Sequence, residues 1–282
     1  MKTFGGIPAE FAMQESAKIS ILPVAYDGTS TWGKGADKGP EAFFVASENM
    51  ELYDIETNSE VYRKGIYIED KLSGFKSPEE MVEAVYTKTC GIVETGRLFT
   101  MIGGEHSVSI GAIRAMRNHY KDLSVVQLDA HSDLRPEYDG SACNHACALH
   151  EASKYTNLIQ VGIRSMDSIE LPYLNRDKVF WAHKIHDTTD WIPKLMKMCT
   201  QNVYVTIDLD AFDPSVLPGT GTPEPGGLYW YQVNELLVNL AKQCNIVGFD
   251  ITELSPIEGE KISEFFSAKL YYRFLSMIFN KK

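Results

Sequence analysis

Short runs of valine, isoleucine and leucine alternate along the chain with longer segments in which apolar residues recur every three or four positions. The runs are typical of strands buried in a parallel sheet, and the longer spacing is typical of helices that cover such a sheet. The predicted strands are Ile19–Val24, Leu98–Ile102, Ser124–Asp129, Leu158–Val161, Val203–Asp208 and Ile246–Phe249. The predicted helices are Pro78–Glu94, Ser107–His119, Ile192–Cys199, Tyr229–Ala241 and Ile262–Ile278. The alternation predicts a single three-layer α/β/α domain over residues 1–282.

The length and composition are sufficient for one large core. The chain has 282 residues, of which 44% are hydrophobic and 23% are charged, so no disulfide or metal ion is needed for folding. No segment approaches the roughly 18 apolar residues of a membrane helix, and the N-terminus lacks the layout of a secretory signal. Five scattered cysteines favour reduced thiols. We therefore expect a soluble cytoplasmic protein without a membrane partner.

The net charge of the chain is −11, and no cluster of basic residues interrupts it. This balance excludes the electrostatic footprint of a nucleic-acid-binding protein. An acidic surface could attract a cationic metabolite, although many proteins are this acidic only for solubility.

Acidic and histidine side chains follow three of the predicted strands. They are His106 after the second predicted strand, Asp129, His131 and Asp133 at and after the end of the third, and Asp208 and Asp210 at and after the end of the fifth. Because ligands of open parallel sheets gather beyond the carboxyl ends of the strands, we expect these side chains to meet at one edge. An extended backbone points alternate side chains in the same direction, so members of each group can also converge.

Convergence of unpaired acids at the end of an apolar sheet is costly unless a divalent cation is present. Taken alone, Asp129 or Asp208 is typical of an aspartate that caps a helix or shapes a turn after a strand, without any metal. Capping does not explain two acidic groups together with His106 at a third strand. Carboxylate and imidazole ligands favour manganese, with zinc, cobalt and iron left open by ligand type. If Asp129 and Asp208 each bridge, two ions about 3.5–4 Å apart could share a hydroxide.

The chain resembles the ureohydrolase family of arginases, agmatinases, guanidinobutyrases and formiminoglutamases, and agmatinases most of all. The resemblance rests, in family order, on Gly103-Gly-Glu-His106-Ser107, Asp129-Ala-His131-Ser-Asp133, Asp208-Leu-Asp210-Ala-Phe-Asp213-Pro214, Gly221-Thr-Pro-Glu-Pro-Gly-Gly227 and Asp250-Ile-Thr-Glu253-Leu-Ser-Pro256. It implies a three-layer sandwich around a parallel sheet of about eight strands. It also implies assembly as a homotrimer or homohexamer.

The resemblance further implies two manganese ions in each chain. One would be held by His106, Asp129, Asp133 and Asp208, and the other by Asp129, His131, Asp208 and Asp210. A hydroxide that bridges the two ions would attack the carbon of a guanidinium group, and collapse of the tetrahedral intermediate would release urea and an amine.

Three residues receive catalytic roles from the resemblance. Glu253 would bind the guanidinium group, because a carboxylate matches its fork of N–H donors. Asp133 would contact both metal and hydroxide and relay a proton. His145 would shuttle protons or contact the substrate, a task that suits an imidazole.

The substrate expected from the resemblance is a small cationic guanidine, with agmatine the leading candidate. Arginases typically carry asparagine at the position of Arg135, where it holds the amino-acid end of arginine, so arginine is disfavoured. If Arg135 faces the pocket, it could instead pair with a carboxylate and favour guanidinobutanoate or formiminoglutamate. Aminopropylagmatine would fit the same chemistry as agmatine, and the sequence does not separate the two.

Three alternatives remain open from the sequence. A deacetylase of the same fold would use one zinc ion, and an inert protein of the fold would bind no metal. Cys143, His145 and Cys147 could also form a separate zinc site, but three ligands within five residues lack a fourth partner.

Overall fold

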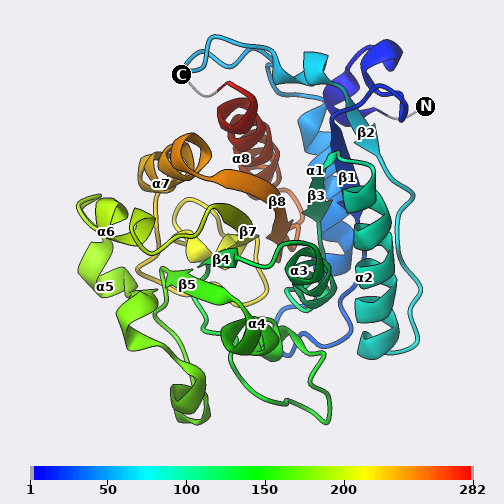
Figure 1. The fold of residues 1–282 in the computed structure, drawn as a ribbon. Coiled ribbons are helices and arrows are strands. Elements are labelled where there is room, and N and C mark those ends of the chain that lie inside the picture. Colours follow the sequence, from blue (N-terminus) through cyan, green and yellow to red (C-terminus); the bar gives the residue numbers. More distant parts are fainter. Residues whose placement is uncertain (1–2, 281–282) are drawn as a thin grey trace.

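The computed structural model describes residues 3–280, and its centre is one parallel sheet (Figure 1). The sheet has eight strands in the order β2-β1-β3-β8-β7-β4-β5-β6, and all neighbouring strands are parallel. The strands are β1 Ile19–Pro23, β2 Ile66–Ile68, β3 Leu98–Ile102, β4 Leu123–Leu128, β5 Asn157–Val161, β6 Val179–Phe180, β7 Asn202–Asp208 and β8 Asn245–Thr252. The parallel sheet expected from the sequence is confirmed.

Helices cover both faces of the sheet, which makes the fold a three-layer sandwich (Figure 1). The α-helices are α1 Gly39–Ser47, α2 Pro78–Glu94, α3 Val108–His119, α4 His150–Tyr155, α5 Ala182–Ile185, α6 Ile192–Met196, α7 Trp230–Gln243 and α8 Ile262–Phe279. Helix α2 begins where the sequence requires it, because the Ser77 hydroxyl accepts the N–H of Glu80 and Pro78 occupies the first turn.

Each face of the sheet has its own hydrophobic core. On one face, Tyr271 and Phe274 of α8 pack their rings against Phe249 of β8, with centroids 5.2 and 4.7 Å away. On the other face, residues of α2 and α3 such as Val85 and Met116 are fully buried. The strands between these cores are therefore apolar on both sides, as their continuous hydrophobic runs indicate.

All predicted strands and helices are present, with ends that shift by at most three residues. The sequence pattern missed the two edge strands β2 and β6, and also α1, α4 and α5. The edge strands have only three and two residues, which is too short for a recognisable hydrophobic run. Among residues 3–280, no helix is long and apolar enough to cross a membrane.

The strand order places the candidate site. After β3 the chain skips two positions to form β4, and β8 and β7 later fill the gap. The central strands β3, β8, β7 and β4 therefore end side by side at one edge. In open parallel sheets, ligand sites lie beyond the carboxyl ends of the strands, at points where the order of strands along the chain changes direction.

Candidate metal centre

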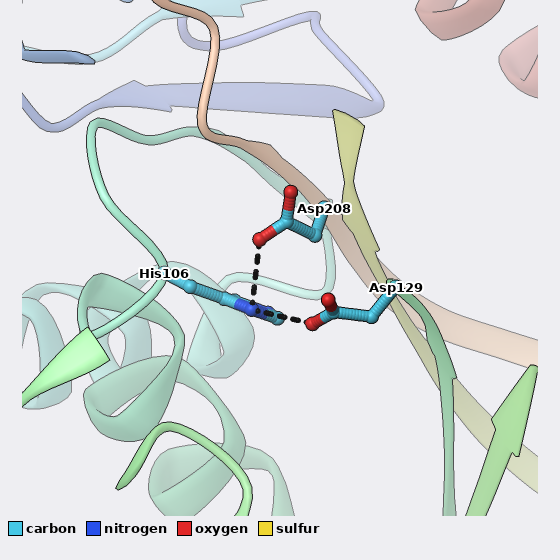
Figure 2. Close-up of side chains that lie close together, drawn as sticks. All are labelled: His106, Asp129 and Asp208. Atoms are coloured by element: carbon cyan, nitrogen blue, oxygen red, sulfur yellow. Dashed lines mark ion pairs between the residues drawn. The ribbon is translucent and has the colours of Figure 1, made fainter. Parts of the chain in front are cut away.

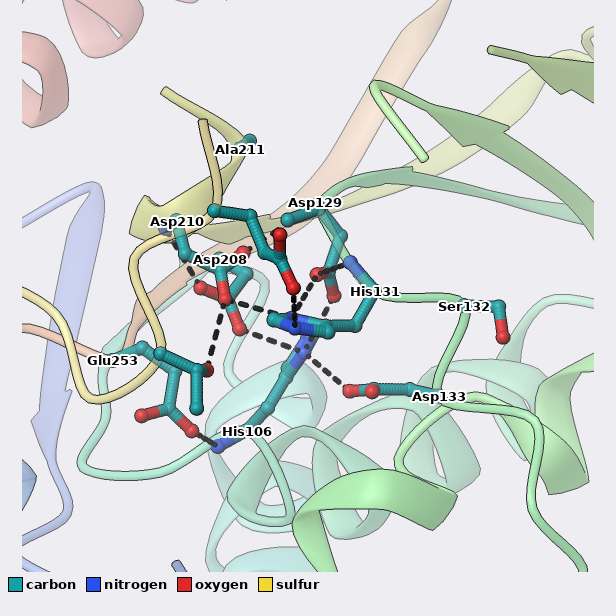
Figure 3. A network of polar contacts seen from close by, with 12 residues as sticks. His106, Asp129, His131, Ser132, Asp133, Asp208, Asp210, Ala211 and Glu253 are labelled. Atoms are coloured by element: carbon teal, nitrogen blue, oxygen red, sulfur yellow. Dashed lines mark hydrogen bonds and ion pairs between the residues drawn. The ribbon is translucent and has the colours of Figure 1, made fainter. Parts of the chain in front are cut away.

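The carboxyl ends of β3, β4 and β7 bring the predicted metal ligands together (Figure 3). Two groups have ligand atoms within 4.8 Å of one another. The first group contains His106, Asp129 and Asp208, and the second contains Asp129, His131 and Asp210. Asp129 belongs to both groups, whereas Asp208 belongs to the first alone.

The first group surrounds the Nδ1 atom of His106 (Figure 2). Oδ2 of Asp129 and Oδ2 of Asp133 each lie 3.0 Å from this nitrogen, and Oδ2 of Asp208 lies 3.3 Å away. The His106 side chain is only 1% exposed. Asp133 thus lies beside the first group, to which the resemblance of the sequence motifs assigned it.

The other ring nitrogen of His106 is fixed by a hydrogen-bond chain. Nε2 lies 2.8 Å from the Thr206 hydroxyl, which donates to Oδ1 of Asp250 at 2.7 Å. Because that hydroxyl proton is used on Asp250, Nε2 carries a hydrogen, and Nδ1 is the ring nitrogen left to bind a cation. Nδ1 has no partner with hydrogen-bond geometry, although three carboxylates face it. A buried imidazole nitrogen among three carboxylate oxygens fits a divalent cation, and the partner on the far nitrogen is typical of metal-binding histidines.

The second group is centred on His131. Its Nδ1 lies 2.9 Å from Oδ2 of Asp210 and 3.7 Å from Oδ1 of Asp129. On the outer side, Nε2 lies 3.8 Å from Oε1 of Glu224. Nitrogen and oxygen ligands from residues of this kind suit a second divalent ion beside the first.

Asp129 and Asp208 each cap a backbone N–H group and also face the metal site. Oδ1 of Asp129 accepts the N–H of His131 at 2.6 Å, and Oδ1 of Asp208 accepts the N–H of Asp210 at 2.9 Å. In each residue Oδ2 faces His106. One carboxylate oxygen shapes the loop while the other is directed into the site.

Mutual repulsion within the cluster shifts its protonation. Burial, together with the charges of Asp133 and Asp210, raises the pKa of Asp129 to about 7. Burial lowers the pKa of His131, but the carboxylates, led by Asp210, outweigh it and raise this pKa to about 11. When no metal ion is bound, protons on Asp129 and His131 therefore compensate part of the negative charge of the cluster.

Manganese is expected to raise the melting temperature of the protein more at pH 8 than at pH 6. The folded protein binds protons on Asp129 and His131 more tightly than the unfolded chain. The stability that these bound protons give the folded protein is complete below the pKa values of the unfolded chain. It is lost as the pH rises through the folded pKa values, about 7 for Asp129 and about 11 for His131. Since metal displaces these protons, its net stabilisation grows with pH. Thermal unfolding with and without manganese measures the difference, and a larger gain at pH 6 would contradict the assignment.

The predicted guanidinium ligand, Glu253, follows β8 and lies beside the first metal group (Figure 3). Its Oε1 accepts the N–H of His106 at 2.7 Å. Burial and the nearby charge of Glu105 raise its pKa well above the usual range. Both Glu253 and Asp133 have positive φ angles, 64° and 52°. Such backbone strain in non-glycine residues clusters at functional sites.

A cavity of about 280 Å³ opens above these residues. Asp133, His145 and Glu253, the three predicted catalytic residues, all line it, and so does Arg135. Nη2 of Arg135 bonds Oδ2 of Asp167 at 3.1 Å. The Arg135 guanidinium also stacks 4.5 Å from the Tyr138 ring centroid. The guanidinium group of Arg135 thus already has an anionic partner at the cavity wall, which argues against its use as a binding site for a substrate carboxylate.

Two other expectations can be compared with the structure. Neither ligand group contains a cysteine, so the structure gives no support to a zinc site at Cys143 and Cys147. All five cysteines lie within residues 3–280, and none forms a disulfide.

Asp213, the third acid of the segment that carries Asp208 and Asp210, lies outside both ligand groups. Its carboxylate accepts the N–H groups of Gly226 and Gly227 instead.

The sequence patterns missed several residues that support the ligands. Nε2 of Gln127 donates to Oδ2 of Asp129 at 2.7 Å, and Oε1 of Gln127 accepts from Gln160. Oε1 of Glu170 accepts the Ser132 hydroxyl and, at 2.8 Å, the N–H of Leu134, one residue on either side of Asp133. Polar residues within otherwise apolar strands, such as Gln127 and Gln160, were the available signal.

The parallel sheet and the shared carboxylate and histidine groups at its carboxyl edge form a site suited to divalent metal ions. The chain matches the model of the arginase family over residues 17–276. It is 37% identical to the N(1)-aminopropylagmatine ureohydrolase of Synechocystis sp. over 92% of this chain and 88% of that protein. It is 32% identical to the agmatinase of Pyrococcus horikoshii over 93% of each. The agmatine ureohydrolase structure of Thermoplasma volcanium superposes with a TM-score of 0.85 at 29% identity, covering 94% of this chain and 91% of that one.

The chain belongs to the arginase family, and the resemblance to ureohydrolases is confirmed. It is a ureohydrolase, a hydrolase that cleaves a guanidino group. Family membership favours this class over the single-zinc deacetylase and the inert protein.

Proposed function

We propose that this ureohydrolase acts on an aliphatic guanidine that carries an ammonium group and no carboxylate. Agmatine and N(1)-aminopropylagmatine both meet this description. The observation that carries the proposal is the paired state of Arg135 in a cavity whose lining includes the acids Asp133, Asp208, Asp210 and Glu253. Without an unpaired cation, such a cavity favours a positively charged substrate over one that bears a carboxylate.

The second of these substrates is favoured by the sequence relatives. Proteins named N(1)-aminopropylagmatine ureohydrolase from Synechocystis sp. and Thermus thermophilus are 37% and 33% identical to this chain. The agmatinase of Pyrococcus horikoshii is 32% identical. The assay below therefore compares the two substrates directly.

Two manganese ions are proposed as the cofactor, bound by His106, Asp129, Asp133 and Asp208 and by Asp129, His131, Asp208 and Asp210. When bound, such ions lower the pKa of water and make hydroxide available at neutral pH. The buried His106 Nδ1 atom, which faces three carboxylates without a hydrogen-bond partner, and the sharing of Asp129 between the two ligand groups support this assignment.

The remaining chemistry is assigned to side chains of the cavity. Glu253 receives the guanidinium group and holds its carbon toward the metal centre. Asp133 takes up the proton released as the nucleophile attacks and relays it toward the departing amine. His145, which lines the same cavity, delivers a proton to the departing amine, because an amine leaves readily only when protonated.

We further propose that one catalytic domain spans residues 1–282 and acts in the cytoplasm as a homotrimer or homohexamer. Cysteines without disulfides support the compartment. Exposed apolar side chains on and near the first turns of α7 and α8, among them Tyr231, Ile262 and Phe265, support self-association. Light scattering of the purified protein measures the size.

Urea release with manganese is expected from agmatine or N(1)-aminopropylagmatine at a kcat/KM at least about 100-fold above that for arginine or guanidinobutanoate, because a mispaired buried charge costs several kcal/mol. Urea is measured colorimetrically across the four compounds, with formamide release from formiminoglutamate assayed in parallel. A preference for a carboxylate-bearing compound would overturn the substrate proposal but leave the ureohydrolase class intact.

A further inference from the structure

A polar segment far from the metal ligands in sequence forms part of the cavity wall. Residues 26–31 follow β1, and Thr31 lines the cavity. The segment is held by the motif that carries His106, since the N–H of Glu105 donates to the carbonyl of Tyr26 at 2.9 Å. Gly104 is required here, because a Cβ atom at that position would lie 1.9 Å from the Tyr26 oxygen.

The Glu105 side chain completes the attachment. It is fully buried, and its Oε2 accepts the N–H groups of Thr29 and Ser30 at 2.7 and 2.8 Å. Its Oε1 accepts the hydroxyl of Ser107 at 2.6 Å and that of Thr29. These four groups can all act as donors, so the two carboxylate oxygens can accept a hydrogen bond from each of them.

The Thr29 hydroxyl connects this carboxylate to His145. Oγ1 of Thr29 accepts the backbone N–H of His145 at 3.0 Å and lies 3.2 Å from its Nδ1. A hydroxyl has one proton and two lone pairs. The proton is used on Glu105 and one lone pair on the His145 N–H, so the second lone pair accepts Nδ1–H.

We propose that Thr29 is a positioning residue that fixes the orientation and tautomer of His145. With Nδ1 protonated and turned to Thr29, Nε2 is the ring nitrogen left to exchange a proton within the cavity. The Tyr138 ring, which is nearly perpendicular to the His145 ring with centroids 6.2 Å apart, restricts the His145 ring from another side. The role of Thr29 rests on the proposed role of His145 as proton donor to the departing amine.

The test is a set of three variants of the manganese-loaded protein. Thr29→Val keeps the shape of the side chain but removes the hydroxyl, and it is expected to lower kcat about 10- to 100-fold with KM within about twofold, since general acid catalysis contributes about 10²- to 10⁴-fold. Thr29→Ser restores the hydroxyl and is expected to recover kcat to within about threefold. Ser30→Ala removes a hydroxyl that bonds Glu105 at 3.2 Å, and it is expected to behave as the wild type.

A second readout does not depend on turnover. Side-chain ¹⁵N shifts of histidine-labelled protein, loaded with diamagnetic zinc and assigned with His145→Gln, report which nitrogen carries the proton. The wild type and Thr29→Ser are expected to show Nδ1–H, and Thr29→Val a mixture of tautomers. Wild-type kcat in Thr29→Val, an equal loss in Ser30→Ala, or an unchanged tautomer in Thr29→Val would each overturn the proposal. If the wild type released no urea, the proposed function would fail while the tautomer measurement still tested Thr29.

Discussion

Asp129→Asn is expected to release most of the bound metal and to lower urea release more than about 100-fold. Asp129 is fully buried and belongs to both ligand groups, so one substitution weakens both ions. An amide lacks the negative charge, and Gln127 already occupies Oδ2 with a donated hydrogen bond. Loss of residues that only support metal ligands costs about 10- to 100-fold, so loss of a shared ligand is expected to cost more. Mass spectrometry of dialysed protein measures the metal, and urea assays measure turnover.

The matched control for this variant is Asp213→Asn. Asp213 stands in the same segment as Asp208 and Asp210, but its carboxylate bonds backbone N–H groups of a loop outside both ligand groups. We expect this control to keep its metal. Full activity of Asp129→Asn with two ions bound would contradict the shared role of Asp129.

Glu253→Gln is expected to keep both ions but to lower kcat/KM about 10²- to 10³-fold. Its backbone lies at the end of β8, and Oε1 is already held by the N–H of His106, so the neutral amide still fits the site. What is lost is the charge that pairs with the guanidinium group. Truncation of one partner in such a buried pair costs about 2–5 kcal/mol, and each 1.4 kcal/mol corresponds to tenfold. Steady-state kinetics and metal analysis of the same preparation measure both effects.

Glu137→Gln provides the same chemical change at an exposed position near the cavity and is expected to leave kcat/KM within about twofold. Wild-type kinetics for Glu253→Gln on the preferred substrate would show that Glu253 does not hold the guanidinium group. Loss of metal from this variant would instead assign Glu253 to the metal centre.

The sequence was most informative where local pattern and topology agree. Long central strands such as β4 and β7 have continuous hydrophobic runs, and Asp129 and Asp208 stand at or next to their carboxyl ends. Parallel pairing then places these residues at the same edge of the sheet without knowledge of the strand order. The short strands β2 and β6 carry no comparable signal, because two or three apolar residues occur in any buried segment.

Partners that are distant in sequence could not be found from local pattern. The bond between Arg135 and Asp167 spans 32 residues, and the sequence therefore left the role of Arg135 open. The contact between Thr29 and His145 spans 116 residues. Thr206 and Asp250, which orient His106, are 44 residues apart in the chain but lie on the adjacent strands β7 and β8. Their side chains meet only because β8 enters the sheet beside β7.

The most direct test of the account is metal stoichiometry against activity in the wild type, Asp129→Asn and Glu253→Gln, measured on the same manganese-loaded and dialysed samples. The predicted result is two ions per chain with urea release in the wild type, two ions without efficient release in Glu253→Gln, and loss of both in Asp129→Asn. Full urea release by a wild-type protein that holds one ion or none would contradict a two-metal centre built on Asp129.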